Sequence, residues 1–306
     1  MNKTGIAYLD FAWNPCGFGC SHGCPTCFAR RQATSTGPTA PKCPDCRAFL
    51  FHFHPERLER KLSPAGHRKP AVIGVQFLGD LFDELRPSGE IYGVLAAVYA
   101  APQHTYVFLT QRPAKAAIHL MEWYSTGGGG HVTGGGLPRN WHVGCTIKGP
   151  GPQAMEDIAA LCQIRGRLWL SLEPLAGNVE FYHLNGSSYL HGVDALGCVM
   201  PGRIEGVVIG CDNQLSEPWT NSWARHAIDW ARQVDGLKVY VKQLIVFHCA
   251  TCGHRPTEAE LGRMDNWQCP ACGRPTVLRS CSHDPATFPP DLRDRELPWT
   301  LTTKQP

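Results

Sequence analysis

Short apolar runs alternate with amphipathic stretches through most of the chain, and this alternation predicts its secondary structure. Continuous apolar strands that alternate with helices at least five times are typical of a parallel sheet covered on both faces. We therefore expect an α/β fold, a partial or complete (β/α) barrel. Strands are expected in a β-branched run that begins at residue 71 and at 105–113, 141–149, 167–175, 204–213 and 237–244. Helices are expected at 90–102, 115–124, 154–164 and 219–234.

Other segments depart from this pattern. Residues 49–62 read as a short alternating stretch followed by a charged helix, and the residues after Asp80 are also helix-like. A polar insert lies near 32–48, and a glycine-rich loop lies near 125–138. The expected domains are a barrel core at 1–248, a zinc ribbon at 249–283 and an extended tail, rich in proline and charge, at 284–306.

Composition bears on the partners, the cellular compartment and the state of the cysteines. The 306 residues carry a formal net charge of +3, which neither establishes nor excludes a nucleic-acid partner. The start of the chain lacks an apolar signal region, and the longest apolar run, 91–102, is too short to cross a membrane. We therefore expect a cytoplasmic protein. In a reducing compartment, clustered cysteines are read as metal ligands rather than disulfides, and the chain has 15 cysteines.

Four of these cysteines have the spacing of a zinc ribbon. Two C-x2-C pairs stand sixteen residues apart, and four thiolates close a tetrahedral shell with no open position. Zinc is the expected metal; a rubredoxin-like iron site and free thiols are the alternatives. The ligands would be Cys249, Cys252, Cys269 and Cys272.

The stretch CGFGCSHGCPTC at residues 16–27 has different spacing. Cys20, Cys24 and Cys27 form a C-x3-C-x2-C triplet. Three thiolates satisfy three irons of a [4Fe–4S] cube and leave the fourth iron open for chemistry. The alternative is a closed zinc knuckle that Cys16 completes.

A further C-x2-C, Cys43 and Cys46, resembles half of a zinc site. Its partners could be His52 and His54, which alternate and so could face one side, or Cys281 and His283. Surface thiols without a metal are the alternative.

Polar residues stand where the predicted strands stop, and the chemistry of (β/α) barrels gathers at those strand ends. Each could instead be a turn or capping residue, and Arg112 and Lys242 could form ion pairs at the rim. The residues are Gly79, Asp80, Thr110, Gln111, Arg112, Thr146, Ser171, Glu173, Asp212, Asn213, Lys242 and Gln243.

The cysteine triplet after a strand resembles the signature of the radical S-adenosylmethionine (SAM) superfamily. The blocks YLDFAWNP, FHPERLE, FLGDLFDE, APQHTYVFLTQRP, LSLEPL, VVIGCDN and VYVKQL occur in that order. Together they resemble a family of phage and bacterial radical-SAM-like proteins over residues 4–247. This resemblance implies that the triplet holds the cluster and that SAM binds its open iron. It implies SAM contacts at Gly79, Asp80, Phe28, Thr110, Ser171 and Glu173.

The resemblance also implies an activity. A 5′-deoxyadenosyl radical would take a hydrogen atom from a substrate held near Lys242, Arg112 and Asp212. Phage members are associated with thymine hypermodification, so the expected reaction is the rearrangement of a modified thymine, such as a glycyl adduct, in DNA. A DNA-lesion lyase is the second enzymatic reading. A non-catalytic zinc-knuckle protein that binds nucleic acid is the third. The enzyme readings imply DNA or a modified nucleoside as partner, an external electron donor and, for a phage protein, the host cytoplasm.

Overall fold

A computed structural model describes residues 1–25, 27–37, 40–127, 136–179, 181, 190, 192, 198–211, 220–261, 263–264, 268–297 and 299. The strands in this part of the chain are β1 (Asn2–Lys3), β2 (Phe11–Trp13), β3 (Val72–Val75), β4 (Thr105–Thr110), β5 (Trp141–Thr146), β6 (Arg167–Leu172), β7 (Arg203–Gly210), β8 (Lys238–Cys249) and β9 (Val277–Ser282). The α-helices are α1 (Phe28–Ala33), α2 (Pro44–Arg47), α3 (Ser88–Tyr99), α4 (Pro113–Ser125), α5 (Pro152–Cys162), α6 (Thr220–Arg232) and α7 (Glu258–Leu261).

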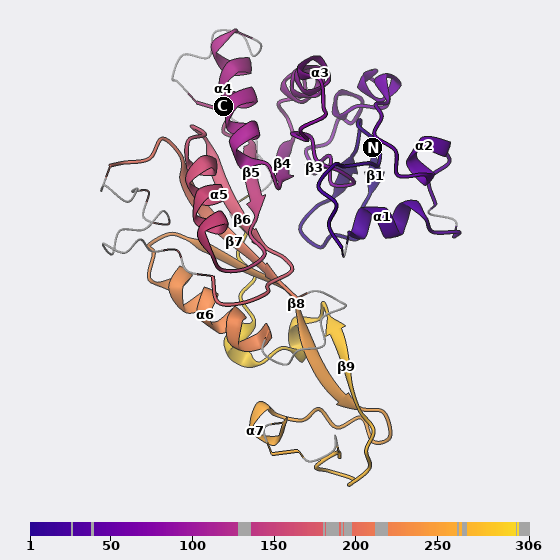
Figure 1. The fold of residues 1–306 in the computed structure, drawn as a ribbon, viewed down its shortest axis with the longest axis vertical. Coiled ribbons are helices and arrows are strands. Elements are labelled where there is room, and N and C mark those ends of the chain that lie inside the picture. The colour runs from indigo at the N-terminus through magenta and orange to yellow at the C-terminus, as the bar shows by residue number, and fades with distance from the viewer. Residues whose placement is uncertain are drawn as a thin grey trace.

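The strands form one sheet in which each strand lies beside its successor in the chain, from β1 to β9. Neighbouring strands from β2 to β8 are parallel, whereas β1 and β9 pair antiparallel at the two ends of the sheet. In the chain, α3, α4 and α5 connect the successive strands from β3 to β6, and α6 connects β7 to β8 (Figure 1). The predicted mixed α/β fold with a mostly parallel sheet is confirmed, and the described sheet is open.

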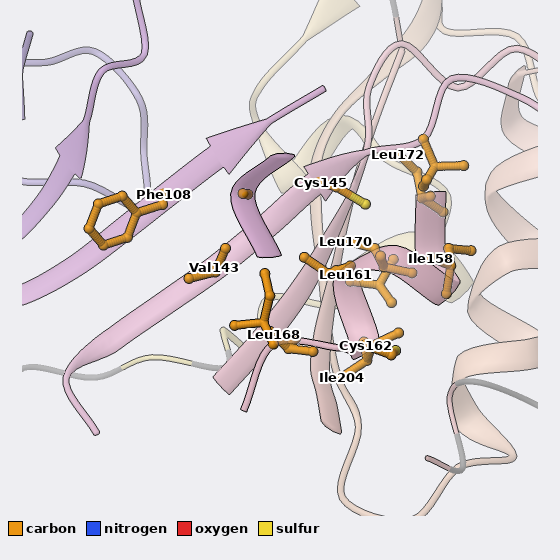
Figure 2. Packing of buried hydrophobic residues seen from close by; sticks show 14 of the residues in the cluster. Phe108, Val143, Cys145, Ile158, Leu161, Cys162, Leu168, Leu170, Leu172 and Ile204 are labelled. Atoms are coloured by element: carbon orange, nitrogen blue, oxygen red, sulfur yellow. The ribbon is translucent and has the colours of Figure 1, made fainter. Parts of the chain in front are cut away.

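One face of the sheet carries the helices and the larger core. Alternate strand residues such as Val143 and Leu170 belong there to one buried cluster with Ile158 and Leu161 of α5 (Figure 2). Strand side chains alternate between the two faces, so their neighbours along each strand point the other way. The continuous apolar runs therefore cover both faces, as expected of parallel strands.

The opposite face is filled by aromatic side chains. Trp169 of β6 and Tyr240 of β8 gather with Tyr8 and with Trp299, which comes from the segment after β9. The Trp299 ring is 3% exposed, lies 5.1 Å from the Trp169 ring and donates from Nε1 to the Tyr8 carbonyl at 3.3 Å. The described part of the predicted tail thus packs against the sheet and completes its second core.

The long strand β8 belongs to two structures. Its first half pairs with β7 in the sheet, and Leu244–Cys249 pairs with β9 as a two-stranded arm. Figure 1 shows this arm leaving the sheet, with α7 beyond its far end. The apolar pattern predicted only the half of β8 that lies in the sheet, and β9 was not predicted.

Two predicted helices were wrong. The charged stretch at 55–62 contains only the 3-10 helix Pro55–Leu58, which ends because Glu59 has the non-helical ψ of 142°, and turns follow it. Residues 81–85 form turns, not a helix, because Asp80 and Asp83 bond backbone N–H groups two residues ahead, at Phe82 and Leu85. No helix among the described residues is long and apolar enough to cross a membrane.

Candidate metal and cofactor site

The cysteine triplet lies on the loop that leaves the first parallel strand. Strand β2 ends at Trp13, and helix α1 begins at Phe28, directly after Cys27. The loop is held to the turn after β3, where Gly19 forms a parallel bridge with Gly79. A side chain on Gly79 would come 2.8 Å from the Gly19 carbonyl oxygen, so glycine is needed for this approach. The loop therefore sits at the carboxyl end of the strands.

Gln76 anchors the first part of this loop. Its Nε2 donates to the Gly17 carbonyl at 2.8 Å, and its Oε1 accepts from the Cys16 N–H at 2.9 Å. Gln76 is fully buried, and its backbone adopts φ +57°, an uncommon geometry for this residue type. Cys16 is fully buried in the core on the helix side of the sheet, whereas Cys20 and Cys27 pack in a separate cluster around Phe18. The structure thus separates Cys16 from the triplet.

Asp83 anchors the next part of the loop. Its Oδ2 accepts from the Ser21 N–H at 2.7 Å. Burial raises the pKa of Asp83, but hydrogen bonds from Leu85 and Ser21 outweigh it, so the pKa is lowered overall. Burial also raises the pKa of Cys20 to about 12, and the Asp80 and Asp83 carboxylates add to this effect. Cys20 becomes a thiolate at neutral pH only when a cation binds it.

The other two thiols face different partners. Lys148, which follows β5, donates from Nζ to the Cys24 sulfur at 3.3 Å, and Gln111 Nε2 lies 3.4 Å from the same sulfur. The Cys27 sulfur accepts from the Arg30 N–H at 3.4 Å and caps helix α1. A cation and an amide at the ends of β4 and β5 thus meet the middle cysteine. Sequence reasoning missed Lys148, which lies within the predicted strand 141–149 and two residues beyond Thr146, where β5 ends.

Among the described residues, two groups of four Cys or His side chains bring all their ligand atoms within 4.8 Å of one another, and the triplet is not one of them. Ligands of a single ion must converge in this way. A cube places its thiolates on different irons, so its ligands stand further apart. This arrangement of Cys20, Cys24 and Cys27 does not match a closed single-ion knuckle.

Asp80 and Thr110 hold each other at the strand ends. The Thr110 hydroxyl donates to both Asp80 oxygens at 2.8 and 2.9 Å, and the N–H groups of Gln111 and Phe82 donate at 2.8 and 2.9 Å. Asp80 is 5% exposed, and burial raises its pKa. These bonds give Asp80 a structural use, since they join the turn after β3 to the end of β4.

Glu173, directly after β6, forms an ion pair with Lys242, which lies in β8 near the point where that strand leaves β7. Lys242 Nζ lies 2.7 Å from Glu173 Oε1, and the Ser171 hydroxyl donates to Glu173 Oε2 at 3.3 Å. Both charged side chains are mostly buried, at 21% and 13% exposed. The pKa of His283 is lowered by burial and by the nearby Lys242. Ser171, Glu173 and Lys242 therefore form one polar group above the aromatic face of the sheet.

Arg112 points toward the cysteine loop. Its guanidinium lies 3.4 Å from Glu84, hydrogen-bonds the His22 ring and donates to the Ser21 hydroxyl at 3.3 Å. The structure therefore does not bring Arg112 and Lys242 into one contact, and each forms an ion pair. Phe28 is 61% exposed beside Cys27. Asp212 and Asn213 lie outside the described residues.

The ribbon cysteines converge at the end of the arm. Cys249 and Cys272 have sulfurs 3.7 Å apart, and so do Cys252 and Cys269. Each C-x2-C turn is closed by a glycine with positive φ: Gly253 donates to Cys249 O, and Gly273 donates to Cys269 O. These four cysteines could hold a metal ion, as their spacing predicts.

The second group consists of Cys43, Cys46, His52 and His54. The His52 Nε2 lies 3.7 Å from the Cys43 sulfur and 3.2 Å from the Cys46 sulfur, and the His54 Nε2 lies 3.3 Å from the Cys46 sulfur. Of the two partner sets that the sequence left open, the structure therefore brings the two histidines to this pair. Cys281 instead lies 3.4 Å from Cys211, sulfur to sulfur.

The fold and these sites define a mixed α/β protein with a mostly parallel sheet and two Cys/His groups that could hold metal ions. Residues 3–268 match the sequence model of the family described as "Protein of unknown function (DUF5131)", and the chain belongs to this family. No curated protein and no solved structure matches the chain.

Proposed function

We propose that this protein is a radical SAM enzyme whose cluster is bound by Cys20, Cys24 and Cys27. The observation that carries the proposal is the position of this loop, which leaves the first parallel strand and lies at the carboxyl ends of the others. Chemistry in (β/α) folds is built at that edge. The open sheet, with every parallel strand beside its successor, supports an incomplete barrel of this type.

The protein groups around the triplet fit a cluster. The thiols of Cys20, Cys24 and Cys27 are half-buried, and Cys16 packs in a different cluster from Cys20 and Cys27, which suits three liganded irons and one open iron. Lys148 lies against Cys24, where a cation offsets the negative charge of a thiolate. Asp83 and Gln76 bind the loop backbone at Ser21 and Gly17 and so keep the loop at the strand ends. When bound, the cluster and SAM would supply a 5′-deoxyadenosyl radical at the expense of one electron from an external donor.

The remaining groups divide into SAM-side and substrate-side roles in this proposal. Phe28, exposed beside the loop, is proposed to cover the adenine of SAM. Ser171 and Glu173 are proposed to meet the ribose or carboxylate of SAM. Lys242, paired with Glu173, is proposed to contact the substrate. Asp80 and Thr110 act by fixing the turn that carries Gly79, since their polar atoms bond one another.

For the substrate we propose a modified thymine in DNA, rearranged without loss or gain of atoms. The support is the resemblance of the ordered sequence blocks to phage proteins. A base within a duplex must be flipped out to reach a pocket at the strand ends. A structural zinc ion at the four cysteines of the arm is part of this proposal, because a closed shell of four thiolates has no open position.

Metal counting in cysteine variants tests the proposal. Protein purified without oxygen should be brown, contain about four irons per chain and, once reduced, release 5′-deoxyadenosine from SAM. Alanine at Cys20, Cys24 or Cys27 should abolish iron binding. Cys16→Ala is the matched control, because it removes a cysteine of the same stretch that packs outside the triplet.

Two results would contradict the proposal. Colourless protein that contains only zinc would favour the nucleic-acid-binding module. Loss of metal in the Cys16 variant as well as in the triplet variants would show a closed four-cysteine site. With the cluster established, mass spectrometry of nucleosides from treated DNA would test the modified thymine.

A further inference from the structure

The group Cys43, Cys46, His52 and His54 has the geometry of a metal site. Bond lengths of about 2.3 Å for zinc–sulfur and about 2.0–2.1 Å for zinc–nitrogen place tetrahedral ligand atoms about 3.3–3.8 Å apart. The observed separations between sulfur and Nε2 atoms are 3.7, 3.2 and 3.3 Å, and the two Nε2 atoms are 2.9 Å apart. These values lie within a few tenths of an ångström of a tetrahedron around one ion.

The outward nitrogens of both rings show which atoms face the centre. His52 Nδ1 lies 2.8 Å from the Leu50 carbonyl oxygen, and His54 Nδ1 lies 2.8 Å from a Glu56 carboxylate oxygen. Both oxygens can only accept, so each Nδ1 carries the proton. In the neutral rings, the two Nε2 lone pairs then face each other at 2.9 Å with no proton between them. A cation at the centre removes this repulsion, and such outer contacts are typical of metal-binding histidines.

The metal-ligand group lies against the backbone of the cysteine loop. The His54 N–H donates to the Pro15 carbonyl at 2.9 Å, and Cys46 packs in one buried cluster with Phe18. A side chain on Gly17, at φ +61°, would come 2.7 Å from His52 Nε2. A side chain on Gly19 would come 2.4 Å from the Leu50 carbonyl oxygen. The loop backbone therefore lies directly on the metal ligands and on the residue that orients one of them.

Hydrophobic packing extends this support to the triplet. Phe18 and Cys46 belong to one buried cluster, and Cys20, Cys27 and Cys43 pack against it. On its other side the loop is held by Gln76 and Asp83. The loop is thus clamped between the turn after β3 and the Cys43–His54 segment. Helix α2 and the turn after it hold the backbone that carries the two cysteines, and a metal ion would tie the two histidines to them.

We propose that Cys43, Cys46, His52 and His54 bind a structural zinc ion that holds the cysteine loop in position for the iron–sulfur cluster. The zinc site stands on its own geometry. Its role for the cluster rests on the function proposed above. The four ligands come from two short stretches of the chain. Cys43 and Cys46 lie at α2, and His52 and His54 lie just before Pro55.

Zinc counting in the full chain tests the site. Wild-type protein should hold about two zinc ions per chain, one in this site and one in the arm. Cys43→Ser and Cys272→Ser should each retain one, and the double variant should retain none. Cys198→Ser is the matched control, since it alters an exposed cysteine outside both groups and should leave the count unchanged. A Cys43→Ser protein that keeps both ions would overturn the proposed site.

A milder variant guards against misfolding. Glu56 is half exposed, and Glu56→Ala removes only the acceptor for His54 Nδ1. Loss of such an outer partner typically lowers metal affinity about 10–100-fold. Competition with a chelator should show this change for one of the two zinc ions. Equal retention of both ions would contradict the assigned geometry.

Hydrogen exchange separates the zinc role from the cluster. In protein with alanine at Cys20, Cys24 and Cys27, removal of this zinc by Cys43→Ser should speed exchange in residues 14–21, with the sheet strands unchanged. Unchanged exchange in the loop would overturn the support role even where zinc is lost. If wild-type protein binds no iron, the proposed function fails, whereas the zinc count and the exchange result stand.

Discussion

His142 allows a quantitative test of how the second core is built. This residue of β5 is 2% exposed, its ring lies 5.7 Å from the Trp299 ring, and its Nδ1 has no hydrogen-bond partner in the described structure. Burial, with a smaller effect from Arg167, lowers the pKa of His142 to about 3. The folded protein therefore keeps this ring neutral at pH values where the unfolded chain protonates it.

The sign and size of the effect follow from proton linkage. An unfolded histidine has a pKa of about 6.5, so between about pH 6.5 and pH 3 the unfolded state binds more protons and stability falls as the pH is lowered. The loss is about 1.4 kcal/mol per pH unit, which gives about 2 kcal/mol between pH 7 and pH 5. At pH 5 the loss of stability depends almost entirely on the pKa of His142 in the unfolded chain, because its pKa in the folded protein lies well below 5.

The assay compares wild-type protein with His142→Phe, which keeps an aromatic ring in this layer and removes the titrating group. Urea unfolding at pH 7 and pH 5 gives the free energy of unfolding of each protein. Wild type should lose about 2 kcal/mol more than the variant over this interval. Other buried histidines, such as His104, add to the loss in both proteins and cancel in the comparison. Equal losses would show that His142 is hydrated or hydrogen-bonded in solution, and the described core would be wrong there.

Two further variants test the packing and the strand-end charges. Trp299→Ala should lower the free energy of unfolding by about 3–5 kcal/mol in urea and reduce the pH effect of His142, because it opens a cavity beside that ring; a cost below about 1 kcal/mol would refute the aromatic core. Lys242→Met should cost about 1–3 kcal/mol, since it leaves Glu173 mostly buried without its cation. The control Lys238→Met removes an ion pair with both side chains about half exposed or more and should cost less than about 1 kcal/mol, so equal losses would contradict the burial of the first pair.

Much of the fold followed from the hydrophobic pattern. Continuous apolar runs predicted the parallel strands because a buried strand has no polar face. The helices between them were predicted because their amphipathic stretches are longer than a strand. The pattern failed where local hydrogen bonds decide the backbone, as at Asp80 and Asp83, which bend residues 81–85 into turns. It also missed β9, whose partner is the extension of β8 rather than the sheet.

The candidate metal sites were predicted from the spacing of cysteines along the chain. Spacing found every C-x2-C pair, because two thiols on one tight turn aim at one point. It could not choose between the histidines and Cys281 for the second site, since that choice depends on tertiary contacts. Lys148 and Trp299 were missed for the same reason: each lies far along the chain from the Cys24 sulfur or the Tyr8 carbonyl that it contacts.

The place of Trp299 in the chain has a consequence for biosynthesis. Every strand of the sheet leaves the ribosome before this residue does. In a nascent chain that has already assembled β2 to β8, the side chains of Tyr8, Trp169 and Tyr240 therefore remain exposed to water until residue 299 has also left the ribosome. During that interval chaperones could bind the exposed aromatic face of the sheet. Only the packing of the Trp299 indole covers this face.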